Sequence, residues 1–160
     1  MKSHKMRYSF ILVIATLALD QLTKWMVLDS IWYPPRRIVV TDFLNFIPVA
    51  NKGISFGLFQ SSSSLGTWII TVFALCVIIV MGIWFFYAKR AWLRIALALV
   101  IGGALGNVID RLHLGWVVDF IDFYFWGWHW PAFNIADSAI TIGVIILVID
   151  GLFTPKKKHK

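Results

Sequence analysis

The sequence predicts an all-α membrane protein with one domain, residues 1–160, and four transmembrane helices. Hydrophobic residues make up 59% of the 160 residues and charged residues only 14%, and the mean hydropathy is +0.78. In a soluble domain about a quarter of the residues are charged. Four apolar runs are each long enough to cross the hydrocarbon core of a bilayer as a helix. They cover approximately residues 8–28, 65–88, 92–109 and 135–153.

The first run has the features of a transmembrane helix that is retained. It follows basic residues and contains Ala15 and Ala18, so a cleavable signal peptide is an alternative. However, the run continues through Asp20 and Lys24, where a polar stripe begins. We therefore favour an uncleaved first helix.

The chain has a net charge of +7, and ten of its 15 Lys and Arg residues lie beside the apolar runs. The flanking basic residues are Lys2, Lys5, Arg7, Lys89, Arg90, Arg94, Lys156, Lys157, Lys158 and Lys160. Because cytoplasmic loops are enriched in Lys and Arg, this pattern predicts that both termini are cytoplasmic. Segments 29–64 and 110–134 are then periplasmic. The charge indicates topology, and no nucleic-acid partner is expected.

The two periplasmic segments differ in composition. Prolines on both sides of residues 37–47 predict short strands in the first segment. The second segment is rich in aromatic residues and is expected to form a surface at the level of the lipid headgroups. These aromatic residues are Trp116, Phe120, Phe123, Tyr124, Phe125, Trp126, Trp128 and Trp130.

Polar residues inside three of the runs recur at helical spacing. A charged group within a span costs roughly 2.5–3.5 kcal/mol on insertion scales, so it needs a partner or a function. The stripes consist of Thr16, Asp20, Thr23 and Lys24, of Asn107, Asp110 and Arg111, and of Asn134, Asp137, Ser138 and Thr141. All three stripes reach the same depth near the outer surface. Glycines at positions 102, 103 and 106 of the third run predict close helix packing.

Two aspartates at that depth are the candidate catalytic pair. Asp119 lies in an apolar stretch, and Asp137 lies at the start of the fourth run. Two neighbouring carboxyl groups in a poorly hydrated pocket tend to share one proton. One can then activate water while its partner polarises a carbonyl group, which is the chemistry of an aspartic peptidase.

Structural roles are alternatives for the charged residues of the stripes. Asp20 and Lys24 can form an intramembrane ion pair, and Asp110 can pair with the adjacent Arg111. Asp137 can also cap the helix that it begins. The remaining aspartates are expected to be solvated or interfacial; they are Asp29, Asp42, Asp122 and Asp150.

Other classes of function are less consistent with the sequence. Residues 53–57 match the GxSxG pattern of serine hydrolases, with Ser55 as nucleophile and His113 or His129 as base. That pattern belongs to a much larger α/β sheet than this chain can form. The two histidines lack metal-binding spacing, so no metal and no cofactor are expected.

A transporter with a proton relay is a further alternative. The relay would consist of charged residues of the stripes, namely Asp20, Lys24, Asp110 and Asp137. A relay would continue toward the cytoplasm, whereas the inner halves of the runs are almost purely apolar. A non-catalytic lipid-binding protein would not need a close carboxylate pair.

Five motifs resemble, in order and spacing, those of bacterial lipoprotein signal peptidase, also called signal peptidase II. They are DQLTK at 20–24, NKGISFG at 51–57, GGALGNVIDR at 102–111, VVDF at 117–120 and FNIADSAI at 133–140. The resemblance implies four spans, a small periplasmic β cradle and a short surface helix that residues 51–60 enter. The sequence departs from the family at Ser55, where Ala is frequent in the family.

The resemblance also implies an activity and a set of site residues. The activity is removal of the signal peptide from diacylglyceryl-modified prolipoproteins in the bacterial inner membrane, with the cut just before the lipidated cysteine. The catalytic pair falls on Asp119 and Asp137. The substrate-binding positions fall on Asp20, Lys24, Asn51, Asn107, Asp110, Arg111 and Asn134. Membrane lipids are expected partners, and the cyclic peptide globomycin is an expected inhibitor.

Overall fold

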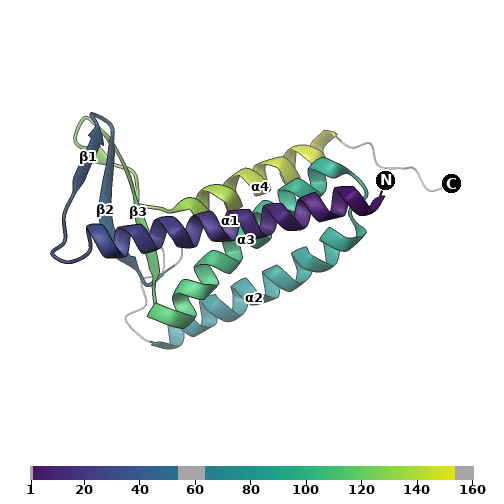
Figure 1. Ribbon diagram of the computed structural model, residues 1–160, viewed down its shortest axis with the longest axis horizontal. Helices are drawn as coiled ribbons and strands as arrows, with labels where there is room; N and C mark the ends of the chain where they lie inside the picture. Colours follow the sequence, from purple (N-terminus) through teal and green to yellow (C-terminus); the bar gives the residue numbers. More distant parts are fainter. Residues whose placement is uncertain (1, 54–63, 154–160) are drawn as a thin grey trace.

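The computed structural model describes residues 2–53 and 64–153, which form four helices and a four-stranded antiparallel sheet (Figure 1). All four helices are long and apolar enough to cross a membrane. The predicted architecture of four such helices with a small sheet is therefore confirmed. The elements are α1 (Lys2–Ser30), β1 (Ile38–Thr41), β2 (Leu44–Asn51), α2 (Ser64–Tyr87), α3 (Ala91–Leu114), β3 (Val117–Phe125), β4 (Trp128–His129) and α4 (Ile135–Phe153).

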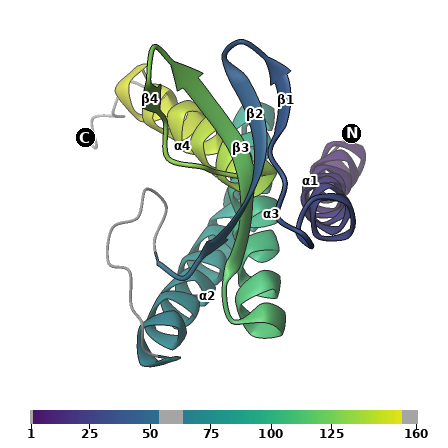
Figure 2. The same ribbon diagram turned by 90° about the vertical axis from the view of Figure 1, so that its left-hand side faces the viewer.

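The helices lie side by side, and the sheet crosses one end of the bundle (Figures 1 and 2). α3 is the central helix and packs against α1, α2 and α4, whereas α2 packs mainly against α3. The beginning of α1 and the end of α4 lie at the end of the bundle away from the sheet (Figure 1). The segment 54–63, where the short surface helix is expected, lies outside the described residues.

Small residues on α3 allow this close packing. A Cβ atom added to Gly102 would lie 2.9 Å from the backbone oxygen of Val13 in α1, and one added to Gly103 would lie 2.5 Å from the backbone oxygen of Ala136 in α4. A Cβ at Gly106 would collide with the carboxylate of Asp20. The packing role predicted for these glycines is confirmed.

α3 ends at Leu114, beyond the predicted end at Ile109. Gly115 adopts a left-handed conformation with a φ of 82°, and its N–H group donates to the carbonyl oxygen of Arg111. Such a glycine is a common helix terminator. Asp110 and Arg111 are therefore helical, and the segment that was predicted to leave the span at residue 110 begins after Leu114.

The sheet has the strand order β1-β2-β3-β4. β1 and β2 include the region where short strands were predicted, but β3 and β4 were not predicted as strands. The residues of β3 are mostly β-branched or aromatic, which favours a strand. Its first four residues are all buried, so the polar and apolar alternation of a half-exposed strand is absent.

Apolar contacts attach the sheet to the helix bundle. Val118 and Phe120 of β3 pack against Val27 and Ile31 near the end of α1. Phe120 is only 4% exposed, so it is not part of the predicted aromatic surface, whereas Trp126 is fully exposed. These contacts fix the position of β3 on the helices. Side chains that extend from β3 toward the bundle therefore also have defined positions.

Gly103→Ala should destabilise the fold, because its methyl group would push α4 away from α3. Overpacking of this kind costs on the order of 1–3 kcal/mol. Gly82→Ala is the matched control, since a Cβ there meets no atom within 4 Å. Thermal unfolding in detergent micelles should show a lower midpoint for Gly103→Ala and no decrease for Gly82→Ala. Equal midpoints for the two variants would contradict the packing role of Gly103.

Candidate active site

A buried ion cluster lies between α1 and α3. The Nζ atom of Lys24 lies 2.8 Å from Oδ2 of Asp20 and 2.8 Å from Oδ2 of Asp110. Its third hydrogen bond goes to Oδ1 of Asn107, at 2.9 Å. Lys24, Asp20 and Asp110 are at most 4% exposed. The three hydrogens of the ammonium group are thus all used, and burial of this charge is compensated.

The cluster also corrects the partner expected for Asp110. Its carboxylate contacts Lys24 and accepts hydrogen bonds from Nε2 of Gln21 and the backbone N–H of Val118. The adjacent Arg111 instead donates to the carbonyl oxygens of Gly53 and Asn107. Adjacent residues of a helix point in different directions, so Lys24, one helix away, reaches Asp110 more easily.

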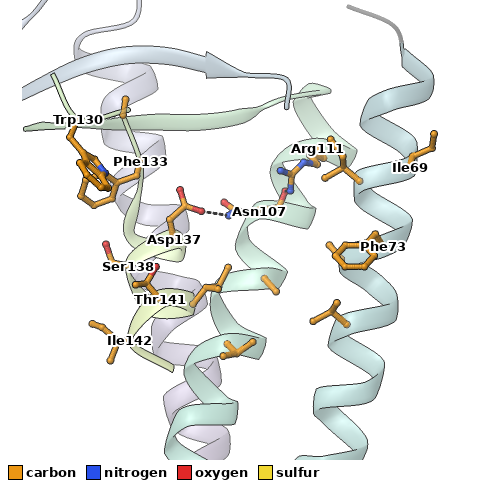
Figure 3. A pocket seen from close by; sticks show the side chains of 17 residues that line it. Ile69, Phe73, Asn107, Arg111, Trp130, Phe133, Asp137, Ser138, Thr141 and Ile142 are labelled. Atoms are coloured by element: carbon orange, nitrogen blue, oxygen red, sulfur yellow. Dashed lines mark hydrogen bonds between the residues drawn. The ribbon is translucent and has the colours of Figure 1, made fainter. Parts of the chain in front are cut away.

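The amide of Asn107 connects this cluster to Asp137. Its Oδ1 accepts from Lys24 and from Nδ2 of Asn134, and its Nδ2 donates to Oδ1 of Asp137 at 2.9 Å (Figure 3). An ammonium group can only donate hydrogen bonds. Lys24 therefore forces the oxygen of Asn107 to face it, and this leaves the amide nitrogen to face Asp137.

Asp137 lies in the first turn of α4 and takes part in the cap of that helix. Its backbone N–H donates to Oδ1 of Asn134 at 2.9 Å, and the backbone N–H of Asn134 donates to Oδ2 of Asp137 at 3.3 Å. These reciprocal bonds form a capping box. The capping role considered for Asp137 is confirmed, but Asp137 also accepts from Asn107 on the side that faces the cavity described below.

Asp119 of β3 is 1% exposed and accepts two amide hydrogen bonds. Nδ2 of Asn134 lies 2.7 Å from its Oδ1, and Nδ2 of Asn51 lies 2.8 Å from its Oδ2. Burial, followed by the negative charge of Asp137, raises the pKa of Asp119 to about 7, although the hydrogen bonds from Asn51 and Asn134 act to lower it.

Asn134 is therefore the residue that joins the two aspartates. Its side-chain amide binds Asp119, and its backbone N–H and its Oδ1 bind Asp137. The sheet brings Asn51 to the same place, because β2 pairs with β3 so that Asn51 lies opposite Val117. The polar stripes predicted to converge do so around these residues.

A cavity of about 760 Å³ lies beside Asp137, between α2, α3, α4 and the segment from Trp130 to Phe133 (Figure 3). Its walls are mainly apolar, with Ile69 and Phe73 of α2 on one side. Asn107 and Arg111 provide polar groups near Asp137. A volume of this size suits a ligand with an apolar body and a few polar groups.

The predicted binding residues fall into three groups. Asn107 and Arg111 line the cavity, whereas Asn51 binds Asp119. The side chains of four others are buried and contact the site's own residues; these are Asp20, Lys24, Asp110 and Asn134. Sequence reasoning did not single out Gln21 or Gly53, which bind Asp110 and Arg111.

Two aspartates expected to be solvated or interfacial are buried. Asp150 pairs with Arg90 at 2.6 Å, and Asp122 lies between Asn45 and His129. Each has a hydrogen-bonding partner from a distant part of the chain, which spacing alone does not reveal. Ser55, the alternative nucleophile, lies outside the described residues.

Comparisons with known proteins agree with this arrangement. Residues 12–153 match the family model of signal peptidase (SPase) II. The chain is 40% identical to a lipoprotein signal peptidase of Methylobacterium radiotolerans, over 96% of this chain and 91% of that protein. It is 41% identical to a lipoprotein signal peptidase of Aeromonas hydrophila, over 99% of this chain and 96% of that protein.

A solved structure of a bacterial membrane enzyme, determined by the in meso method at 2.3 Å resolution, has a similar fold. The TM-score is 0.72 with 34% sequence identity, and the match covers 96% of this chain and 94% of the other. The helices, the sheet and the family model thus point to the same group of multi-pass membrane enzymes, and the chain belongs to the signal peptidase II family.

Proposed function

We propose that this chain is an aspartic endopeptidase that removes the signal peptide from diacylglyceryl-modified prolipoproteins just before the lipidated cysteine. Its family supports the cleavage of lipoprotein signal peptides. The observation that carries the aspartic mechanism is that Asn134 binds both Asp119 and Asp137 beside an apolar cavity. This arrangement supplies two carboxyl groups of different environment at one reacting centre.

In the proposed mechanism the pair carries one proton. The ionised carboxylate takes a proton from a water molecule as the water oxygen attacks the scissile carbonyl carbon. The protonated partner donates to the carbonyl oxygen, which becomes the hydroxyl group of the tetrahedral intermediate. Collapse of the intermediate breaks the C–N bond, and the leaving amine takes the proton that came from water. One hydroxyl group of the intermediate returns its proton to the carboxylate that donated it, so the pair again carries one proton. Asp119 is the protonated member, because its pKa is raised to about 7 by burial and by the charge of Asp137.

The surrounding polar groups would hold the substrate and the pair. Arg111 lines the cavity and already donates to the backbone oxygen of Gly53, so a substrate carbonyl is a suitable acceptor for its remaining N–H groups. Asn107 fixes the carboxylate of Asp137. Asp20 and Asp110 hold Lys24, and Lys24 in turn fixes Asn107. These three residues would thus position the site, in place of the direct substrate contact that the resemblance implies.

The site would lie at the periplasmic surface of the bacterial inner membrane. Asp137 is within the first turn of α4, and Asp119 of β3 is bound to Asn134, the residue before that helix. The diacylglyceryl group of a substrate would remain among the lipids and the signal peptide among the apolar residues of the cavity wall. A cyclic peptide such as globomycin would compete for the same cavity.

Replacement of either aspartate should abolish cleavage. Asp119→Asn and Asp137→Asn each remove one half of a functional unit, so each should lower kcat by about 10³-fold or more, and the double variant should be little worse. The controls are Asp42→Asn, at an exposed turn, and Ser55→Ala. Processing of a lipidated precursor in proteoliposomes measures the effect. Cleavage that persists in either Asp variant excludes the pair, and loss in Ser55→Ala restores the serine alternative.

Cleavage should decrease as the pH rises through about 7. The raised pKa of Asp119 means that its proton is held below that pH and lost above it, and a doubly ionised pair cannot polarise the carbonyl group. Asn51→Leu removes a hydrogen bond that lowers this pKa, so it should move the decrease to higher pH. The pH profile of kcat/KM tests both points, and a profile that Asn51→Leu leaves unchanged contradicts this role of Asp119.

Substrates without the diacylglyceryl group should be cut poorly. The lipid would hold the scissile bond at the depth of the aspartates, and the loss of this positioning should reduce kcat/KM by at least about 100-fold. The comparison uses one precursor with and without the lipid, at equal concentration in the same vesicles. Equal rates for the two forms would contradict the proposed placement of the site.

A further inference from the structure

A second buried polar network crosses the sheet. Asp122 of β3 and Asn45 of β2 are each 1% exposed, and Nδ2 of Asn45 donates to Oδ2 of Asp122 at 2.8 Å. The other carboxylate oxygen, Oδ1, lies 2.7 Å from Nδ1 of His129 in β4. Arg37, just before β1, donates to Oδ1 of Asn45 at 2.9 Å. One chain of hydrogen bonds therefore runs from the residue before β1 through β2 and β3 to β4.

The direction of each bond in this network is fixed. A guanidinium group can only donate, so the oxygen of Asn45 must face Arg37 and its nitrogen must face Asp122. A carboxylate accepts, so Nδ1 of His129 carries the hydrogen that points at Asp122. The ring of Tyr124 lies near both ends of this network. Its centroid is 4.8 Å from the ring centroid of His129 and 5.9 Å from the guanidinium carbon of Arg37.

Asp122 does not belong to the proposed catalytic pair. Residues of a strand alternate between its two faces, so Asp122 and Asp119, three positions apart in β3, point to opposite sides of the sheet. A buried carboxylate costs free energy unless it is hydrogen-bonded, and here both oxygens are used to hold neighbouring strands. The contacts of Asp122 are therefore structural. However, the strand that it holds, β4, is followed directly by a segment that lines the cavity.

The chain leads from this network directly to the proposed active site. After His129, residues 130–133 run along the cavity, and the next residue is Asn134. Trp130, Ala132 and Phe133 line the cavity, and Figure 3 labels Trp130 and Phe133 there. The far end of this segment is held by main-chain bonds between Phe133 and Ile121. The near end is held by β4, which contains only two residues, and by one main-chain bond from the N–H group of Trp130 to the carbonyl oxygen of Phe123. The side-chain bond from His129 to Asp122 supplements that short pairing.

We propose that Asp122 is a positioning residue for substrate binding: its carboxylate holds β4 on β3 and thereby fixes Trp130 and the rest of segment 130–133 as one wall of the cavity. The inference rests on the proposed function, because it assigns the cavity to the lipidated precursor. Without this bond only main-chain bonds hold the wall, so part of it must be ordered when substrate binds, and this lowers affinity. Chemistry at Asp119 and Asp137 is not affected once substrate is bound.

The test exchanges the side chains of Asn45 and Asp122 between their two positions. In Asp122→Asn the amide has one oxygen for two donors, so either Asn45 or, while Nδ1 keeps its hydrogen, His129 faces the new NH2 group. In Asn45→Asp two carboxylates face each other. The double variant Asn45→Asp/Asp122→Asn satisfies every bond again. In it Arg37 and the new amide at position 122 donate to the new carboxylate at position 45, and His129 donates to the amide oxygen at position 122. Asp42→Asn, in the exposed turn between β1 and β2, is the control for the loss of a carboxylate from the same sheet.

Two measurements follow for each purified, folded variant in proteoliposomes. KM for the lipidated precursor should rise about tenfold in each single variant, the effect of one hydrogen bond to a charged group, with kcat within about twofold. The double variant should return KM to the wild-type value. Hydrogen–deuterium exchange of residues 128–134 should be faster in the single variants and restored in the double variant. His129→Leu, at a half-exposed position, tests the same link if Asp122→Asn does not fold.

Several results would overturn this role. A purely structural Asp122 would reduce the amount of active enzyme, so Vmax would fall while KM stayed constant. Single variants with an unchanged KM, or a double variant that remains impaired, would also exclude the proposed hydrogen-bond arrangement. Failure of the wild-type enzyme to cut a lipidated precursor defeats the proposed function instead, and the exchange measurement then still decides whether Asp122 holds segment 130–133.

Discussion

Hydrogen bonding of buried carboxylates is the constraint on which the rest of this structure depends. Asp20, Asp110 and Asp119 are almost completely buried among apolar residues, where an unpaired charge is very unfavourable. A buried cation, Lys24, pairs with Asp20 and Asp110, and two amides, Asn51 and Asn134, donate to Asp119. Because the ammonium group only donates, it determines which way Asn107 points and hence which atom meets Asp137.

The helix bundle and the sheet each supply part of this network, and neither could form it alone. α1 contributes Lys24, α3 contributes Asn107, and the glycines of α3 allow these helices to approach closely. The sheet delivers Asp119 and Asn51 from the side, and Asn134 receives both contributions at the start of α4. Buried polar groups with several partners each have few alternative positions, so the pair is held before substrate arrives.

Much of the fold could be predicted from the sequence, because long apolar runs and helical spacing of polar residues are local signals. The convergence near Asp20, Asn107 and Asp137 followed from the same spacing and from depth in the membrane.

Contacts between distant segments were harder to infer. β3 was missed because both faces of its first half are buried. Asp122 was expected at the surface because its partners, Asn45 and His129, come from other strands. For Lys24 the sequence indicated the ion pair with Asp20 but not the contacts with Asp110 and Asn107, which belong to another helix.

The central claim is that Asp119 and Asp137 act as one electrostatically coupled pair. Infrared difference spectroscopy of the carboxyl C=O stretch measures it most directly, with the spectrum of Asp119→Asn used to assign the band. In the wild-type enzyme the band of protonated Asp119 should disappear at a pH of about 7. In Asp137→Asn burial is retained but the neighbouring negative charge is lost, so the pKa of Asp119 should be lower. An identical titration of Asp119 in both proteins would contradict the coupling.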